Sequence, residues 1–182
     1  MKRVIVAPAD LAGAALDELK AWLAISTPAD DAALIALLRA ALDTCEAFTR
    51  VMPLEAGCEE VLAATRGWHA LATRPVRSIT ALEWLDAGGA RMPIAPADHA
   101  FDITADERGR VQVLRASDHS RMVVGFTAGL APDWAGLPDG MRHGILRLAA
   151  HHYRERNEGS EAGTPPSAIA ALWQPWRRMR LT

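Results

Sequence analysis

The chain has little cysteine, and the cysteines it has form no recognisable pattern. Cys45 and Cys58 are the only two among 182 residues. Two thiols are too few for a disulfide framework, and these two lack the paired spacing of a zinc motif. We therefore expect both to be reduced thiols in a cytosolic setting, with no chemistry of their own.

Long apolar runs are also missing. No uninterrupted apolar stretch reaches the roughly 18 residues of a membrane-spanning helix. The opening segment from Met1 to Val6 is too short for a signal peptide and is soon followed by Pro8. We expect a soluble protein that is made in the cytoplasm and has no membrane partner.

Signatures of catalysis are nearly absent. The chain has no phosphate-binding glycine loop and no nucleophile elbow. The strongest metal candidates are the side chains of His143, His151, His152 and Glu155, because His151 and Glu155 lie four residues apart on one helical face. The adjacent histidines point about 100° apart on a helix, so they cannot easily share one ion.

Carboxylates gather at a second place, without the glycine and spacing of a calcium loop. They are Asp98, Asp102, Asp106 and Glu107, and we interpret them as hairpin and loop residues. We therefore expect no enzyme, no metal and no cofactor. A metal-dependent hydrolase that uses His143, His151 and Glu155 is the weaker alternative.

Charge is divided unevenly along an otherwise ordinary globular composition. Hydrophobic residues make up 50% and charged residues 23%, which fits one compact domain. Residues 1–60 carry 5 Lys and Arg against 10 Asp and Glu, whereas residues 141–182 carry 7 against 3. Such polarity suits head-to-tail self-association, although two solvated faces would look the same. We favour association because the basic end is also aromatic.

Apolar periodicity predicts three long helices, over residues 10–25, 30–50 and 138–158. Short runs of β-forming residues lie between 58 and 128 and are separated by turn residues, with Asp86-Ala-Gly-Gly89 as a hairpin turn. We expect an α+β fold that is mainly α. It would be a small helical bundle with an inserted antiparallel β-hairpin element, followed by an extended C-terminal tail.

The end of the chain combines aromatic and basic residues around a proline. A short helix is expected at Ser167 to Trp173, stopped by Pro175, and Trp176 and three arginines follow. Exposed indoles beside positive charge favour docking to a partner. Trp173 fits its own core or a partner pocket equally well, whereas Trp176 follows Pro175 outside the helix and favours the partner. The arginines leave a small DNA-binding regulatory protein as the other alternative.

Six segments of the chain also match a known family in order and spacing. They are Leu19-Lys-Ala-Trp-Leu-Ala-Ile25, Asp30 to Leu38 running on to Phe48-Thr-Arg50, Arg74-Pro-Val-Arg-Ser-Ile79, Val123-Val-Gly-Phe-Thr-Ala-Gly129, Leu137 to His151 with Tyr153, and Ala171-Leu-Trp-Gln-Pro-Trp-Arg-Arg-Met-Arg-Leu181. Together these segments resemble the head-to-tail connector, or adaptor, proteins of long-tailed bacteriophages and gene transfer agents.

That resemblance implies a structural virion protein. Copies, usually twelve, would form a ring that joins the portal protein to the next neck component, the stopper or head-completion protein. DNA would pass through the lumen without sequence-specific binding. The protein would assemble in the host cytoplasm and then reside in the neck of the particle.

The resemblance also implies where the partners bind. Residues 1–163 would form a single connector domain and residues 164–182 a docking segment for the portal. The docking residues would be Leu172, Trp173, Trp176, Arg177, Arg178, Met179, Arg180 and Leu181. The hairpin at Asp86, Gly88 and Gly89 would face the stopper.

Overall fold

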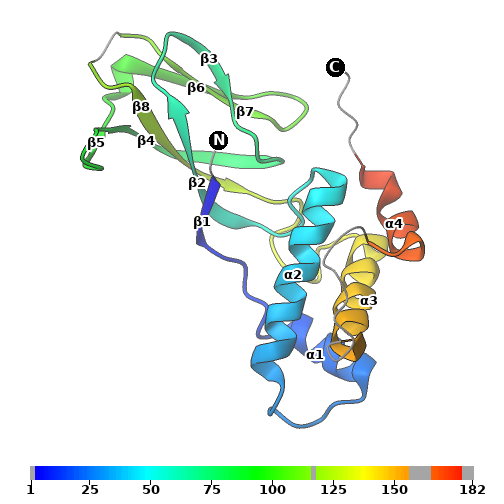
Figure 1. Cartoon of the computed structure of the whole chain (residues 1–182). Coiled ribbons are helices and arrows are strands. Elements are labelled where there is room, and N and C mark those ends of the chain that lie inside the picture. The colour runs from blue at the N-terminus through cyan, green and yellow to red at the C-terminus, as the bar shows by residue number, and fades with distance from the viewer. Residues whose placement is uncertain (1–2, 116–117, 156–164, 178–182) are drawn as a thin grey trace. The chain divides into compact units, whose positions relative to one another are not determined.

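The computed structural model describes residues 3–115, 118–155 and 165–177 (Figure 1). The chain divides into two compact units, each built from two stretches of sequence. One comprises Met1–Pro8 and Glu55–Leu130, and the other comprises Ala9–Leu54 and Ala131–Thr182. The expected boundary between a connector domain over 1–163 and a docking segment over 164–182 lies outside the described residues and stays a prediction.

The first unit is a β structure. Among the described residues it has eight strands in two antiparallel sheets, a five-stranded sheet in the order β1-β2-β8-β4-β5 and a three-stranded sheet in the order β3-β7-β6. The strands are β1 (Arg3–Ala7), β2 (Ala56–Ala63), β3 (Gly67–Ala70), β4 (Val76–Leu85), β5 (Arg91–Pro93), β6 (His99–Ile103), β7 (Gly109–Val113) and β8 (Arg121–Ala128). A short 3₁₀ helix, η1 (Pro96–Asp98), precedes β6.

The expectation of a mainly α fold, a small helical bundle with an inserted β-hairpin element, is therefore wrong. Two strands explain the error. The strand β1 opens the chain and pairs with β2, which begins about 50 residues later, so its partner is not apparent locally. The strand β2 reads Ala-Gly-Cys-Glu-Glu-Val-Leu-Ala and contains few β-forming residues, yet alternate positions are buried.

A buried carboxylate ties β2 to the loop before β4. Glu60 is 1% exposed, and its carboxylate accepts hydrogen bonds from the backbone N–H groups of Ala72 and Thr73, both at 3.0 Å. The Thr73 hydroxyl donates a third, at 2.7 Å. An ionised carboxylate buried without donors would be costly, so this set of three bonds compensates for the lost hydration.

The second unit is helical. Its elements are α1 (Ala14–Leu23), α2 (Asp31–Thr49), α3 (Asp139–Glu155), α4 (Ser167–Trp173) and the 3₁₀ turn η2 (Gln174–Trp176). Residues in the left-handed conformation end the first two helices, Ala24 at φ 57° and Arg50 at φ 62°. The helices α1 and α2 lie within the predicted ranges 10–25 and 30–50 and are shorter than them by a few residues. The helix α3 begins one residue after its predicted start, and its predicted end at 158 lies outside the described residues.

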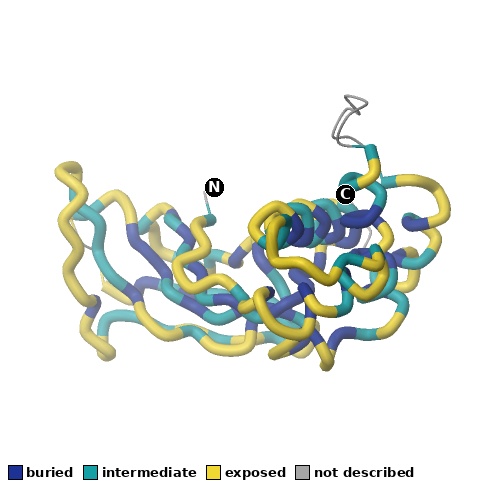
Figure 2. Tube along the Cα trace, turned by 90° about the horizontal axis from the view of Figure 1, so that it is seen from below, coloured by how far each residue is buried: buried dark blue, intermediate teal, exposed yellow. Residues whose placement is uncertain are grey.

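The core of the helical unit follows the apolar faces of these helices. Figure 2 shows buried stretches, in dark blue, in both units. In the helical unit, α1 contributes Leu19, α2 contributes Leu34, Leu38, Ala41 and Cys45, and α3 contributes Met141, Ile145, Leu148 and Ala149. None of the described helices has the length and apolar character needed to cross a membrane.

Candidate docking site

The C-terminal segment is held against α3 by a buried tryptophan. Trp173, at the end of α4, is 0% exposed, and its indole Nε1 donates a hydrogen bond to the backbone carbonyl of Met141 at 3.2 Å. Its ring also lies 6.2 Å from the ring of Phe48, measured between centroids. A buried indole with its N–H satisfied is typical of a core residue. Trp173 therefore belongs to the core of its own unit.

Two glycines on α3 make room for this segment. A Cβ atom at Gly144 would lie 2.8 Å from Cε2 and 3.0 Å from Cδ1 of Trp173, closer than such atoms can approach. One turn earlier, a Cβ at Gly140 would lie 3.2 Å from Cη2 of Trp176. The missing side chains let both indoles approach the backbone of α3.

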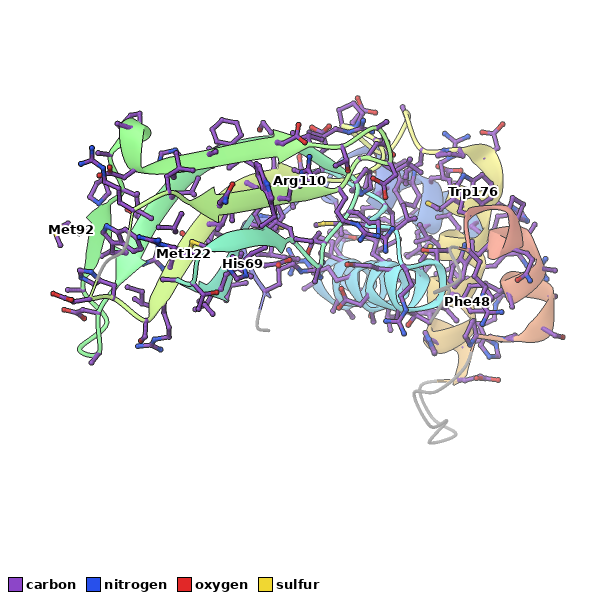
Figure 3. All side chains as sticks on the ribbon, turned by 90° about the horizontal axis from the view of Figure 1, so that it is seen from above. Phe48, His69, Met92, Arg110, Met122 and Trp176 are labelled. Carbon is purple, nitrogen blue, oxygen red and sulfur yellow. The ribbon has the colours of Figure 1, made fainter. Side chains whose placement is uncertain are left out.

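The last described residues continue along the same unit. Pro175 lies in η2 and cannot extend the helix, since it lacks an N–H donor. Trp176 is half-buried, and the guanidinium of Arg177 lies over the ring of Phe48, 5.1 Å from its centroid. Figure 3 labels Phe48 and Trp176 on this unit. We call Trp173, Trp176 and Arg177 the C-terminal anchor.

The remaining docking candidates divide into two groups. Leu172 is half-buried on α4. Four candidates lie outside the described residues, namely Arg178, Met179, Arg180 and Leu181. Their docking role stays a prediction, but their starting point is known, because Arg177 immediately before them contacts Phe48.

The hairpin candidate forms a tight turn between β4 and β5. The carboxylate of Asp86 accepts a hydrogen bond from the N–H of Ala90 at 2.7 Å, and its backbone carbonyl accepts one from Arg121 at 2.9 Å. Gly89 has a φ of 89°, which disfavours any other residue there. Gly88 and Gly89 are exposed. The turn lies where the sequence placed it, and its contact with a stopper stays a prediction.

The metal candidates do not converge. His151 pairs with Glu155 at 3.0 Å, whereas His143 packs edge-to-face against Trp22 with ring centroids 5.3 Å apart. Within the described ranges, no three His, Cys, Asp or Glu side chains are placed to hold a metal ion.

The second group of carboxylates is engaged by arginines. Asp102 pairs with Arg110, which Figure 3 labels, at 2.8 Å, and Asp98 pairs with Arg115 at 3.1 Å. Asp106 lies 3.7 Å from Arg108. These pairs join neighbouring strands and loops of the β unit, as the hairpin interpretation expected.

The sequence did not reveal the residues that contact the C-terminal anchor. Gly140, Gly144 and Phe48 drew no attention as functional residues, although the first two carry a readable signal. Two glycines four residues apart lie on one face of a helix, and such a pair indicates close approach of another element. Nothing in the sequence singles out Phe48 from other apolar residues of α2.

Comparison with known proteins gives matches among solved structures. No protein-family model matches the chain, and no curated protein matches its sequence. Three similar solved structures come from gene transfer agent (GTA) particles, each with a chain 29% identical to this one over 100% of this chain and 98% of its own. They are the neck of an empty GTA particle computed with C6 symmetry, the virion of a native GTA particle, and the neck of a native GTA particle computed with C12 symmetry, with TM-scores of 0.79, 0.75 and 0.76.

The similarity spans both units rather than one shared module, since it covers the whole chain. It also agrees with the segments that run from Leu19 to Leu181 in the sequence. The chain is therefore similar over its whole length to chains of gene transfer agent necks, which supports a structural protein of the particle neck and agrees with the resemblance to head-to-tail connector proteins.

Proposed function

We propose that this protein is the connector that joins the portal to the next neck component around the DNA channel, and that it has no enzymatic role. The observation that carries the proposal is the C-terminal anchor. Trp173 and Trp176 hold the end of the chain on α3, immediately before the sequence Arg178-Met-Arg-Leu181. The similarity to chains of GTA necks supports the same role.

The anchor refines which residues dock to the portal. Trp173 is fully buried, so docking falls to the four residues after Arg177 together with the accessible parts of Leu172 and Trp176. A docking segment that starts from a fixed point loses less conformational freedom on binding than a longer loose tail. Two arginines within it provide charged hydrogen-bond donors for acidic or backbone acceptors on the portal.

The symmetry of two similar structures, which were computed with C6 and C12 symmetry, supports a ring. We propose twelve copies around the channel, each making modest contacts that the ring multiplies. The exposed turn at Gly88 and Gly89 would contact the stopper. DNA would pass through without base recognition, and the ring would assemble in the host cytoplasm before it becomes part of the neck.

The experiment is co-sedimentation with purified portal rings, comparing the full chain with a chain that ends at Arg177. The shorter chain keeps the anchor, so it should keep the thermal stability of the full chain. We expect portal binding to fall at least about tenfold, which corresponds to about 1.4 kcal/mol. Equal binding by a stably folded short chain would move the portal interface elsewhere.

A second arm of the same experiment addresses DNA. If the full chain fails to bind portal but binds duplex DNA with a steep salt dependence, a DNA-binding regulatory protein replaces the connector. A connector should show weak DNA binding that is the same for the full chain and the short chain under portal-binding conditions.

A further inference from the structure

A basic cleft of about 420 Å³ opens on the helical unit, between the end of α1, the face of α3 and the start of α4. Its lining includes Trp22 from α1, His143, Arg147, His151 and Arg154 from α3, and Ile169 from α4. The α3 residues lie three or four positions apart, so they share one face of the helix. We call this feature the basic cleft.

Two arginines, Arg147 and Arg154, give the basic cleft its positive charge. Arg147 and Arg154 are exposed, and in the part of the chain that the structure describes neither makes an ion pair or hydrogen bond. His151 is paired with Glu155 at 3.0 Å, so it adds little net charge. Two unpaired guanidinium groups in a concave site favour an anionic occupant.

The walls of the cleft indicate which kind of anion. Trp22 is 44% exposed and lines the cleft together with the two arginines, and Ile169 is a second apolar residue of the lining. Apolar walls around two charged groups suit a carboxylate carried on a protein segment, which can fill both parts. A DNA duplex could meet the exposed arginines with its phosphates, but it would leave the apolar walls uncovered.

The N-terminal stretch of the same unit is acidic in composition. This stretch, residues 9–54, has 7 Asp and Glu against 3 Lys and Arg. Most carboxylates there have partners, as Asp31 has in Lys20 and Glu18 in Trp134. Asp17 is exposed, and among the described residues its carboxylate makes no hydrogen bond or ion pair. It lies about 140° around α1 from Trp22, so it faces away from the cleft of its own copy.

We propose that the basic cleft receives the exposed Asp17 carboxylate of a neighbouring copy, an inference that rests on the proposed ring. Neighbours in a cyclic ring contact each other through two different patches, and these must be complementary. The exposed carboxylate of Asp17 on α1 and the arginines of the basic cleft meet that requirement through opposite charge. Arg147 and Arg154 are then the residues that hold one subunit to the next.

Disulfide trapping tests this contact without the portal. Cysteines replace Asp17 and Arg147 in one chain, and each replacement alone serves as a control. The native Cys45 and Cys58 are buried, so they contribute little background. Under mild oxidation at high protein concentration, the double variant should form a ladder of trimers and larger species. Either single variant can form no product larger than a dimer through the new cysteine.

Charge reversal provides the second variant. Arg147→Glu with Arg154→Glu should reduce the steepness of cooperative binding to portal rings, and addition of Asp17→Arg in the same chain should restore it. Arg39→Glu is the matched control, because Arg39 is an exposed arginine on α2 outside the cleft. We expect the reversed chain to need about tenfold more protein for half-filling of the portal.

The outcomes separate this contact from the connector role. A ladder from the double variant supports the contact even if portal binding fails, in which case only the proposed function falls. The absence of a ladder, both in solution and on portal, overturns it. If charge reversal leaves portal filling equal to that of Arg39→Glu but removes DNA binding, the cleft contacts DNA and the proposed contact is wrong.

Discussion

Replacement of Gly144 by alanine should destabilise the helical unit, although alanine is the better helix former. The added methyl group would lie 2.8 Å from Cε2 of Trp173, and α3 backbone and a rigid indole leave it little room. Trp173 would have to move, which breaks its hydrogen bond to Met141 and opens space around Phe48. The C-terminal anchor would loosen with it.

The expected magnitude is a balance of three terms. Alanine gains about 1 kcal/mol of helix propensity over glycine. Overpacking a core typically costs about 1–3 kcal/mol, and loss of the indole hydrogen bond costs about 1 kcal/mol more. The net loss is about 2 kcal/mol, equivalent to a fall in melting temperature of about 4–8 °C for a chain of this length.

Thermal and urea unfolding followed by circular dichroism measure this loss. Gly13→Ala is the control for steric overlap, since a Cβ there meets nothing within 4 Å; because Gly13 is the N-cap of α1, where alanine is disfavoured, we expect it to cost about 1 kcal/mol at most. The decisive comparison adds Trp173→Leu. In that background the indole is gone, so Gly144→Ala should no longer destabilise. Wild-type stability of Gly144→Ala, or the same cost in both backgrounds, would refute the anchor.

Four further predictions concern three buried side chains, Glu60, Cys45 and Trp134. Glu60→Ala leaves the Thr73 hydroxyl and two backbone N–H groups without their acceptor, so it should lower the free energy of unfolding by about 2–3 kcal/mol in urea, with Glu60→Gln milder. Burial raises the pKa of the Cys45 thiol from 9.0 to about 12, so the folded protein should resist alkylation by iodoacetamide at pH 8 until urea is added. The same rise in pKa means that Cys45 loses its proton at a lower pH in the unfolded chain than in the folded protein. The contribution of the Cys45 thiol to stability is therefore complete below pH 9 and declines as the pH rises from 9 towards 12. A Cys45→Ala variant should show a flatter decline in stability over that range. Trp134→Phe removes the 2.7 Å hydrogen bond from the indole to Glu18 and should cost about 1 kcal/mol in the same urea assay, whereas no loss would mean that water replaces the bond fully.

Helical periodicity predicted where the helices lie, and the short helix at Ser167–Trp173 coincides with α4. Periodicity succeeds there because each helix forms its hydrogen bonds locally and buries one face. The sheets depend on pairs that are remote in sequence, such as Cys58 with Phe126. Such pairs leave only a weak local pattern, and the small and acidic residues of β2 weakened it further.

In the candidate site, too, contacts between residues that are remote in sequence could not be predicted. The sequence showed that Trp173 needs a pocket but not which pocket, because the space is made by Gly144 almost thirty positions away. The proline between the two indoles correctly indicated the end of α4. The role of Arg177 depended on Phe48, which only the folded helical unit brings beneath the guanidinium.

The division of each unit between two stretches of sequence has a consequence for how the chain becomes folded during synthesis. The helices α1 and α2 leave the ribosome long before α3, whose first residue is Asp139. Until then their apolar faces lack the partner that covers them. A fragment ending at Leu130 would likewise contain every strand of the β unit but leave α1 and α2 uncovered. To isolate either unit, one must therefore rejoin its two stretches with a new linker rather than cut the gene once.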